Sequence, residues 1–400
     1  MESWQRSLYV TAFGELVALS GFSMVLPFLP YYMQELGITD LPGVTMWSAL
    51  ALSSHAVTLA LFAPIWGLLA DRHGRKLMVE RSMFGGALVM IAMAFVQTAP
   101  QLVLLRAIQG CLTGTVAAAT TLVASTVPRK RYGYAMGVLQ TAVFSGISVG
   151  PMLGGVLAGT VGIRSSFLVS GALGAVAGLA VHLFVHEDFK PRAQDDQGAK
   201  GVSRSHFKLI FSSRALVSAL GLRTSIRTAV RMLNPVLPLI VLSMVPRGSN
   251  VAMVTGLIMG INGVGSALGA VVLGRISDQV GSRRVLLICC LGAAGAYFAQ
   301  FFSDQTWQLF ILQAGVGILL GGTVATLSAL LANLAPEEAA GSVFGVDAST
   351  MASANAVGPL IGAAVAARLG LRSLFLCTGI VLALAGLGTS KLMPGQEEKR

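Results

Sequence analysis

The segment Gly67-Leu68-Leu69-Ala70-Asp71-Arg72-His73-Gly74-Arg75-Lys76 is a short charged stretch between two long apolar ones. A related segment, Gly274-Arg275-Ile276-Ser277-Asp278-Gln279-Val280-Gly281-Ser282-Arg283-Arg284, follows at an offset of 207 residues, measured from Asp71 to Asp278. Two other landmarks recur after 208 residues: Gly150-Pro151 returns as Gly358-Pro359, and the Arg-Ser-x-Phe of residues 164–167 returns at 372–375. Similarity at a fixed spacing indicates an internal duplication. The sequence therefore predicts two related halves.

The composition predicts that most of this chain lies in a lipid bilayer. Hydrophobic residues make up 54% of the chain, charged residues 11%, and the mean hydropathy is +0.75, far from the averages of soluble domains. A helix needs about 20 apolar residues to cross the hydrocarbon core. Twelve stretches meet this need, six in each half: 7–34, 46–70, 78–97, 99–126, 134–158, 164–185, 213–244, 250–274, 284–303, 305–333, 341–367 and 371–392. Continuous apolar runs exclude an outer-membrane barrel, whose strands alternate. We expect an all-α membrane protein with twelve transmembrane helices in two pseudo-symmetric six-helix bundles.

A polar stretch between the halves sets the expected domain boundaries. Residues 1–186 form the N-terminal bundle, 187–212 a flexible cytoplasmic linker, and 213–400 the C-terminal bundle. The first apolar segment is too long for a signal peptide and lacks a small-residue cleavage site, so we expect it to be retained as the first span. The four cysteines lie in apolar runs without metal-type spacing, which predicts neither disulfides nor a metal site.

The distribution of basic residues predicts the orientation. One side of the spans carries 20 Lys and Arg residues, the other carries four, and the remaining four lie within spans. The basic side is cytoplasmic by the positive-inside rule, which places both termini inside. The net charge of +11 therefore reflects membrane topology and does not indicate a nucleic-acid partner. We expect a multi-pass protein of a bacterial inner (plasma) membrane.

Three motifs resemble signatures of the major facilitator superfamily. Gly67 to Lys76 resembles the family's G-x-L-a-D-r-x-G-r-k loop between spans 2 and 3, and Leu102-x-x-x-Arg106-x-x-Gln109-Gly110 resembles a motif of its proton-coupled members in span 4. Gly146-x-x-x-Gly150-Pro151-x-x-Gly154-Gly155 resembles the motif associated with antiporters in span 5. The resemblance covers the whole chain and implies the twelve-span drug/proton antiporter-like branch. It also implies a functional monomer.

Two of these motifs also have a physical interpretation. In the loop after span 2, Asp71 can cap a helix N-terminus or pair with a nearby arginine, so we expect a conformational latch made of Gly67, Asp71, Arg72, Gly74 and Arg75, with Asp278 in the second copy. In span 5, glycines spaced by four residues permit close packing and Pro151 bends the helix. We expect a seam between the halves at Gly146, Gly150, Pro151 and Gly154, with Gly358 and Pro359 as its repeat. A purely structural kink is the alternative.

Two acids lie within the spans, Glu15 in span 1 and Asp347 in span 11. An ionised carboxylate is costly there, which makes a function the default hypothesis. Helix rise places Glu15 and Arg106 within several ångströms of the same depth, so the two could meet directly or through Gln109. We expect Glu15, Arg106 and Asp347 to handle protons, with a static partner of an arginine as the alternative for Glu15.

Span 7 carries Arg223, Arg227 and Arg231 at positions i, i+4 and i+8, which share one helical face. Three charged side chains facing lipid would cost too much free energy. We therefore expect this face to line the water-accessible cavity between the halves. Guanidinium groups suit carboxylates and phosphates, which favours an anionic or zwitterionic substrate bound by these arginines with Gln109 and Asn234. The alternative is that span 7 begins later and Arg223 is interfacial.

No nucleotide-binding loop or catalytic motif is present in the sequence, so we expect no enzyme activity and no cofactor, with energy from an ion gradient. The expected function is a proton-coupled antiporter that exports small amphiphilic molecules by alternating access, either drug-like compounds or an anionic metabolite such as a siderophore. A proton symporter importing an organic anion is the first alternative. A non-transporting membrane sensor or scaffold is the second.

Overall fold

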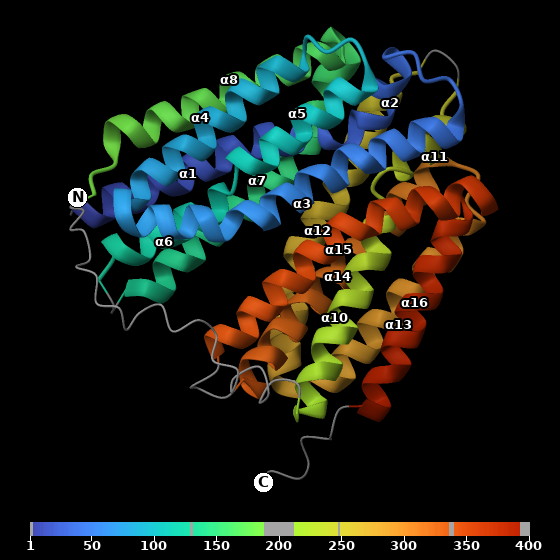
Figure 1. Cartoon of the computed structure of the whole chain (residues 1–400). Coiled ribbons are helices and arrows are strands. Elements are labelled where there is room, and N and C mark those ends of the chain that lie inside the picture. The colour runs from blue at the N-terminus through green and yellow to red at the C-terminus, as the bar shows by residue number, and fades with distance from the viewer. Residues whose placement is uncertain (1–2, 129–130, 188–211, 247–248, 336–339, 393–400) are drawn as a thin grey trace. The chain divides into compact units, whose positions relative to one another are not determined.

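The computed structural model of the chain describes residues 3–128, 131–187, 212–246, 249–335 and 340–392. All regular structure in this part is helical (Figure 1). The chain divides into two compact units, Met1–Asp195 with Arg247–Gly260, and Asp196–Pro246 with Ile261–Arg400. The expected linker, apart from Glu187 and Ser212, lies outside the described residues. The boundaries drawn from the sequence stay a prediction.

The first unit contains the first six expected spans. They are α1 (Ser3–Met24) with the short η1 (Leu26–Phe28) and α2 (Leu29–Glu35), α3 (Leu41–His73), α4 (Arg75–Met93), α5 (Ala99–Leu112) with α6 (Thr115–Thr126), α7 (Tyr132–Val161) and α8 (Ile163–Phe184). Helix α1 packs mainly on α7 and α8, α4 packs on α8, and α3 packs on α5. Buried aliphatic side chains of α1, α4, α6, α7 and α8 form the core, among them Leu8, Met83, Leu122, Leu139 and Val181.

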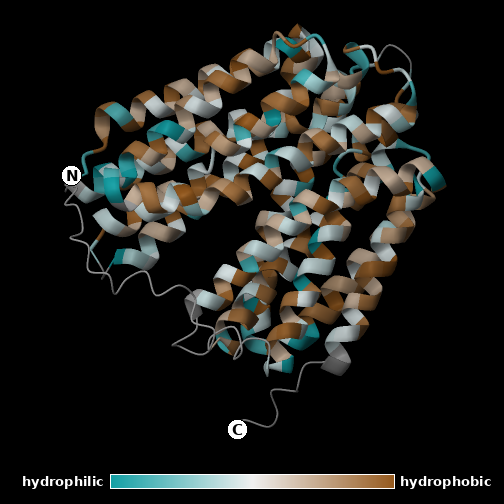
Figure 2. Ribbon diagram, in the orientation of Figure 1, coloured by the Kyte–Doolittle hydropathy of each residue, from teal (hydrophilic) through white to brown (hydrophobic). Residues whose placement is uncertain are grey.

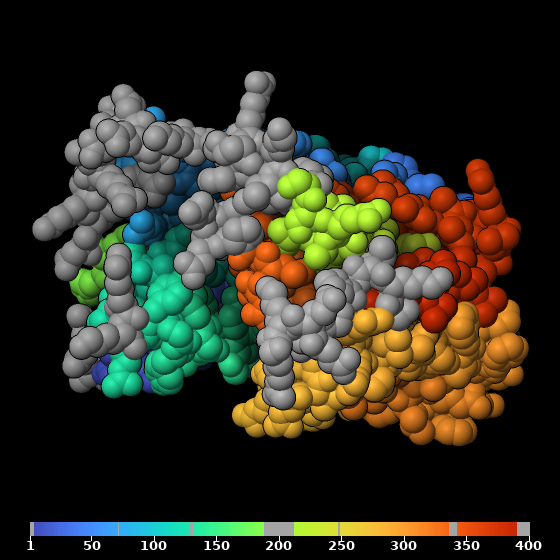
Figure 3. All heavy atoms as spheres, turned by 90° about the horizontal axis from the view of Figure 1, so that it is seen from below, coloured from blue at the N-terminus to red at the C-terminus, as the bar shows by residue number. Residues whose placement is uncertain are grey.

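The second unit contains the other six spans. They are α10 (Arg214–Met232) with α11 (Leu237–Met244), α12 (Val251–Val280), α13 (Ser282–Phe301), α14 (Thr306–Leu334), α15 (Ala340–Leu369) and α16 (Ser373–Leu392). Residues of α12 up to Gly260 belong to the first unit. Helix α13 packs on α14 and α16, while α10 packs on α15 and α16. Figure 3 shows the end of this unit at which α10 (yellow-green) begins beside α15 (orange) and α16 (red).

The twelve-span prediction is confirmed by this helix order. Ten helical stretches in the described residues are long and apolar enough to cross a membrane, and Ser373–Thr389 of α16 is a shorter apolar helix. Helix α4 falls outside that set because its first turns carry Arg75, Lys76, Glu80 and Arg81. Figure 2 shows hydrophobic residues (brown) along the long helices, with white and teal residues between them.

The duplication is visible in the backbone. Gly74 and Gly281, 207 residues apart, both begin a helix with positive φ, of 99° and 98°. Gly162 begins α8 and Gly370 follows α15, with φ of 91° and 87°. Positive φ is accessible to glycine at little cost, which explains why the repeat retains these glycines.

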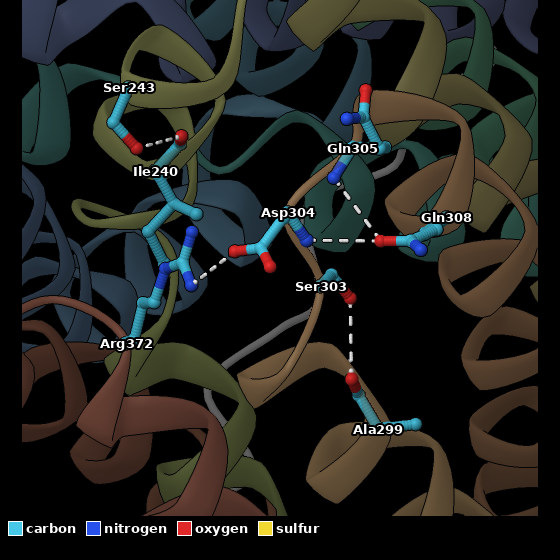
Figure 4. A network of polar contacts seen from close by, with 8 residues as sticks. All are labelled: Ile240, Ser243, Ala299, Ser303, Asp304, Gln305, Gln308 and Arg372. Atoms are coloured by element: carbon cyan, nitrogen blue, oxygen red, sulfur yellow. Dashed lines mark hydrogen bonds and ion pairs between the residues drawn. The ribbon is translucent and has the colours of Figure 1, made fainter.

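Helix N-terminal capping boxes also recur at this spacing. Thr98 and Gln101 form one at the start of α5, and Gln305 and Gln308 form the other at the start of α14. In the second box the Gln308 side chain accepts from the backbone of Asp304 and Gln305, at 3.0 and 3.2 Å (Figure 4). Capping satisfies amides that have no partner within the helix.

One position breaks the pseudo-symmetry. Span 4 is interrupted at Gly114, whose φ is 124°, and is therefore two helices, α5 and α6. The equivalent residue 207 positions later is Gly321, which lies within the unbroken α14. The sequence predicted one continuous span at this place.

Candidate functional site

Glu15 lies in the interior of the first unit. Its residue exposure is 0%, and neither carboxyl oxygen has a hydrogen-bond partner in the described structure. The Thr115 side chain is its polar neighbour, although the two groups do not form a hydrogen bond of good geometry. Thr115 is the first residue of α6, directly after the interruption of span 4. A buried carboxyl without a partner is costly in its ionised form.

The expected meeting of Glu15 and Arg106 does not occur in this structure. The Arg106 guanidinium donates instead to the Ala51 carbonyl, at 3.3 Å, and to Gln109 Oε1, at 2.6 Å. Helix rise predicted the depths of Glu15 and Arg106 along the membrane normal. It did not predict the direction in which either side chain points. Arg106 therefore has its own partners on α3 and α5, and Glu15 is not a static partner of arginine here.

A polar chain continues from Arg106 towards the interruption of span 4. The Thr113 hydroxyl donates to the Gln109 carbonyl at 2.8 Å and lies 3.4 Å from His55 Nε2. Both Gln109 and Thr113 are buried. The sequence singled out Arg106 and Gln109, and the structure shows that these residues are bonded to each other within one buried network.

In the second unit, Arg223 and Asp347 form an ion pair. Arg223 Nε lies 3.1 Å from Asp347 Oδ1, and the two side chains are 9% and 8% exposed. The alternative in which span 7 begins later and Arg223 is interfacial is not supported, because α10 begins at Arg214 and places Arg223 in its buried middle.

Arg227 and Arg231, the other two arginines of the i, i+4, i+8 row, have no carboxylate within ion-pair distance in the described structure. Arg227 has Arg223, Arg231 and Asp347 as electrostatic neighbours, and its Nε is buried without a hydrogen bond. Arg231 lies where Gly358 of α15 approaches closely, since a methyl group at Gly358 would lie 2.7 Å from Arg231 Cβ. This cluster therefore holds three cations and one anion, and a bound anion would reduce that excess.

Asn234 lies between the two helices of span 7. It follows the end of α10 and precedes α11, and its backbone amide donates to the Arg231 carbonyl at 3.3 Å. The amide is partly exposed. Asn234 lies two residues after the end of α10, and its role in substrate binding stays a prediction.

The loop after span 2 is organised by a residue that the sequence analysis did not select. Gly74 separates α3 from α4, and the Glu187 carboxylate accepts from the backbone amides of Arg75 and Lys76, at 3.1 and 2.7 Å. Lys76 also donates to the carbonyl of His182 in α8, at 2.8 Å. The expected cap of α4 is therefore supplied by Glu187, which comes from beyond α8. The Asp71 side chain lies outside the described residues.

The remaining members of the expected latch are exposed. Arg72 and Asp278 face away from the interior of their units, and a methyl group added at Gly67 would meet no atom within 4 Å. Gly67 is therefore not required by packing within its unit.

Three glycines of the expected seam pack inside the first bundle, whereas the Pro151 carbonyl of the seam approaches Gly256 of α12. Gly146, Gly150 and Gly154 of α7 all face α1: a methyl group at Gly146 would lie 2.7 Å from the Leu16 carbonyl, and Gly150 and Gly154 approach Ser23 and Met24. The prediction of a seam between the halves is thus wrong for these three glycines. Helical spacing revealed that they share a face but not which helix lies opposite.

The second repeat packs in the same manner. Gly358, beside Pro359 inside α15, approaches Thr228 and Arg231 of α10. Span 5 therefore packs closely on span 1, and span 11 packs closely on span 7. Pro151, like Pro359, lies inside its helix without ending it.

Two intramembrane polar groups were missed. Arg81 stacks over Trp66, with its guanidinium carbon 3.5 Å from the ring centroid, and the Trp66 indole donates to the Cys111 carbonyl at 2.6 Å. Its position inside the expected span 78–97 was the available signal, because the charge count had assigned Arg81 to the loop. A cation–π contact stabilises a guanidinium group that is poorly hydrated.

The second missed group is the pair Gln313 and Gln300, which form a chain of amides with Asn262. Asn262 Nδ2 donates to Gln313 Oε1 at 2.8 Å, and Gln313 Nε2 donates to Gln300 Oε1 at 3.2 Å. Gln313 follows Arg106 by 207 residues. The first unit thus has a cation where the second has a neutral amide, a difference that aligning the two repeats would have revealed.

Within the described residues, no group of three or more His, Cys, Asp or Glu side chains could hold a metal ion. The four cysteines are free. A buried carboxyl such as that of Glu15 can take up or release a proton when its surroundings change, and a group of guanidiniums such as that on α10 can bind an anion.

Comparison with known proteins places this fold in a family. The family model described as Major Facilitator Superfamily matches residues 11–244 and 224–400. The multidrug resistance protein MdtG of Enterobacter lignolyticus (strain SCF1) is 34% identical over 381 residues, which cover 95% of this chain and 90% of the relative. MdtG of Salmonella dublin is 34% identical over 385 residues, 95% of this chain and 94% of the relative. Among solved structures, a bacterial homologue of the human lysosomal transporter Spinster, inward-facing and unoccupied, has a TM-score of 0.80 at 14% identity, with 98% of each chain covered.

Proposed function

The chain belongs to the Major Facilitator Superfamily and is a multi-pass secondary transporter rather than an enzyme, and we propose that it is a proton-coupled antiporter that exports amphiphilic molecules. The direction of transport follows the relatives, whose name is multidrug resistance protein. The proposed setting is a bacterial inner membrane with both termini in the cytoplasm, and the proposed active form is a monomer.

The observation that carries the proton coupling is the environment of Glu15. Its carboxyl is fully buried and has no cation within ion-pair distance in the described structure, so the neutral form is held at low cost and the ionised form needs a change of surroundings. A site that alternates between these forms as the transporter moves takes up a proton in one state and releases it in another. Arg106 and Gln109 lie in a separate network of the same bundle. From there they would influence proton binding at Glu15.

The substrate that we propose is anionic or zwitterionic. Arg223 is neutralised by Asp347, whereas Arg227 and Arg231 add two charges to the same face of α10. A guanidinium in a low-dielectric surrounding binds a carboxylate or phosphate through paired hydrogen bonds. When the anion binds, the Asp347 carboxylate would leave its ion pair with Arg223 and take up a proton.

Transport also requires that helices move, and the loop and glycine motifs have proposed roles there. The segment from Gly67 to Arg75 would act as a cytoplasmic latch whose contacts form in one conformation and break in another. The close packing of α7 on α1 and of α15 on α10 would let each pair move as one body, because glycine contacts leave no space for relative tilting.

The test uses purified protein in vesicles with an acidic interior and an internal pH dye. An amphiphilic cation such as ethidium and an amphiphilic carboxylate such as a fluorescein derivative are added outside, to wild type, Glu15→Gln and Arg227→Ala. Antiport predicts that the interior becomes more alkaline, that Glu15→Gln abolishes this change, and that Arg227→Ala abolishes the response to the carboxylate. An alkaline response to ethidium alone that Arg227→Ala leaves intact would overturn the anionic substrate while retaining antiport.

Import of an organic anion with protons is the second candidate, and the same excess of arginines on α10 favours it. Symport predicts the opposite sign in this assay, since substrate entry would bring protons in and acidify the interior. A non-transporting sensor predicts no change of internal pH in any variant.

A further inference from the structure

The interruption of span 4 places a helix N-terminus inside the first unit. Helix α5 ends at Leu112, Gly114 has a φ of 124°, and α6 begins at Thr115. The first amides of α6 have no acceptor within that helix, because its first internal bond runs from Ala118 to the Gly114 carbonyl. An α-helix N-terminus carries partial positive charge and free N–H groups, both of which favour an anion.

An unpartnered carboxyl is directed at this end. Thr115, the first residue of α6, is the polar neighbour of Glu15, and both residues are buried. Helices α4, α6, α7 and α8 all pack against α1, and no charged side chain in the described part of these helices interacts with the Glu15 carboxyl. The N-terminus of α6 is therefore the electropositive group that the described structure offers to this carboxylate.

The interruption has no counterpart in the second half. Gly321 occupies the equivalent position, and α14 runs unbroken from Thr306 to Leu334. The residue at the equivalent of Glu15, 211 positions later by the spacing of Pro27 and Pro238, is Ile226. The half that contains the intramembrane glutamate in span 1 is thus the half in which span 4 is broken.

We infer that the N-terminus of α6, exposed by the break at Gly114, is the docking site of the ionised form of Glu15. In this arrangement the protonated carboxyl lies beside the Thr115 side chain, and loss of the proton lets the carboxylate accept from the amides of Thr115 and Val116. Gly114 and α6 are positioning elements for the proton site. The inference rests on the proposed role of Glu15 in proton handling and specifies what stabilises its charge.

The decisive variant removes one amide and leaves the break intact. Val116→Pro deletes the N–H at the second position of α6, where proline is compatible with helical geometry. Pro42 and Pro100 already occupy the second positions of α3 and α5 in this chain. Val116→Ala keeps the amide and shortens the same side chain, which makes it the matched control.

The readout is the infrared C=O stretching band of the protonated carboxyl, followed against pH in nanodiscs without substrate and assigned by its loss in Glu15→Gln. Val116→Pro is expected to move the titration midpoint of this band to higher pH by about one unit. A shift of this size corresponds to the loss of one charge-assisted hydrogen bond to the carboxylate. Val116→Ala should leave the midpoint in place. If Val116→Pro does not fold, Thr115→Val, which removes the hydroxyl at the first position, should shift the midpoint in the same direction by a smaller amount.

An unchanged midpoint in folded Val116→Pro, or in Thr115→Val when the proline variant does not fold, would overturn the inference. So would the absence of any titrating band that Glu15→Gln removes. The failure of the proposed function has a different signature: internal pH changes in vesicles that survive Glu15→Gln would overturn proton coupling through Glu15, even if the Val116→Pro shift is observed.

Discussion

At the scale of single residues, the ion pair of Arg223 and Asp347 joins two side chains that are each less than one tenth exposed (9% and 8%). Removing one member of such a pair leaves a buried charge without compensation, which costs on the order of 3 kcal/mol. We expect Asp347→Asn and Arg223→Gln each to destabilise the detergent-solubilised protein by about this amount, with a lower Tm. The double variant should lose clearly less than the two single losses together.

An exposed pair in the same unit provides the comparison. Arg372 and Asp304 lie 3.0 Å apart, with side chains 39% and 77% exposed (Figure 4), and exposed pairs contribute less than about 1 kcal/mol. Arg372→Gln should therefore change Tm little. Additive losses in the Arg223 and Asp347 double variant would show that the two groups are not coupled in the folded protein.

At the scale of elements, the start of α4 depends on a cap that comes from beyond α8. Glu187 accepts from two backbone amides of α4 and so ties the loop after span 2 to α8. Loss of a side-chain cap costs about 1 kcal/mol. We expect Glu187→Ala to accelerate hydrogen–deuterium exchange of the first turn of α4, residues 75–78, by about fivefold.

Asp40 provides a matched control for that experiment. It caps α3 from an adjacent position, with its carboxylate accepting from Gly43 at 2.7 Å. Asp40→Ala should accelerate exchange at the start of α3 and leave α4 unaffected. Equal exchange at residues 75–78 in wild type and Glu187→Ala would show that the cap contributes nothing.

This cap also illustrates what the sequence could and could not predict. Span positions follow from local hydropathy, so the twelve spans and the repeat were predictable, and the motif in span 4 contains both Arg106 and Gln109, which bond to each other at i+3. The partner of α4 lies 112 residues from Arg75, and nothing local identifies such a residue. The break at Gly114 was equally hidden, because that glycine is one of 47 and only its backbone angle distinguishes it.

At the scale of the whole molecule, the distribution of basic residues predicts one orientation in the membrane. Asp304 and Asp278 are both exposed in the structure and lie at opposite ends of the α13 span. We expect a membrane-impermeant maleimide to label Asp304→Cys in intact cells and to label Asp278→Cys only after the membrane is opened. The native cysteines are buried or partly buried, so the wild-type protein gives the background. The reverse labelling pattern would invert the topology and the direction of the proposed transport.

The two halves differ in charge although they share a fold. The first carries an unpaired acid, Glu15, and the second carries a row of arginines with one acid among them. Duplication would have given both halves the same set, and under the proposed function Glu15 of the first half would couple transport to protons while the arginines of α10 in the second half would bind the substrate. Variants in each half should then fail in different ways.

We therefore expect Glu15→Gln to bind the carboxylate probe with normal affinity and to exchange it across the membrane when no pH gradient is present, while losing all accumulation driven by protons. Arg227→Ala should instead weaken binding about 30-fold, since losing a charge-assisted contact costs about 2 kcal/mol, and should lose exchange and accumulation together. Binding is measured by fluorescence anisotropy, and exchange by release of preloaded probe from vesicles. Equal loss of binding in both variants would show that proton and substrate share one site, which would require Glu15 to lie within reach of the substrate.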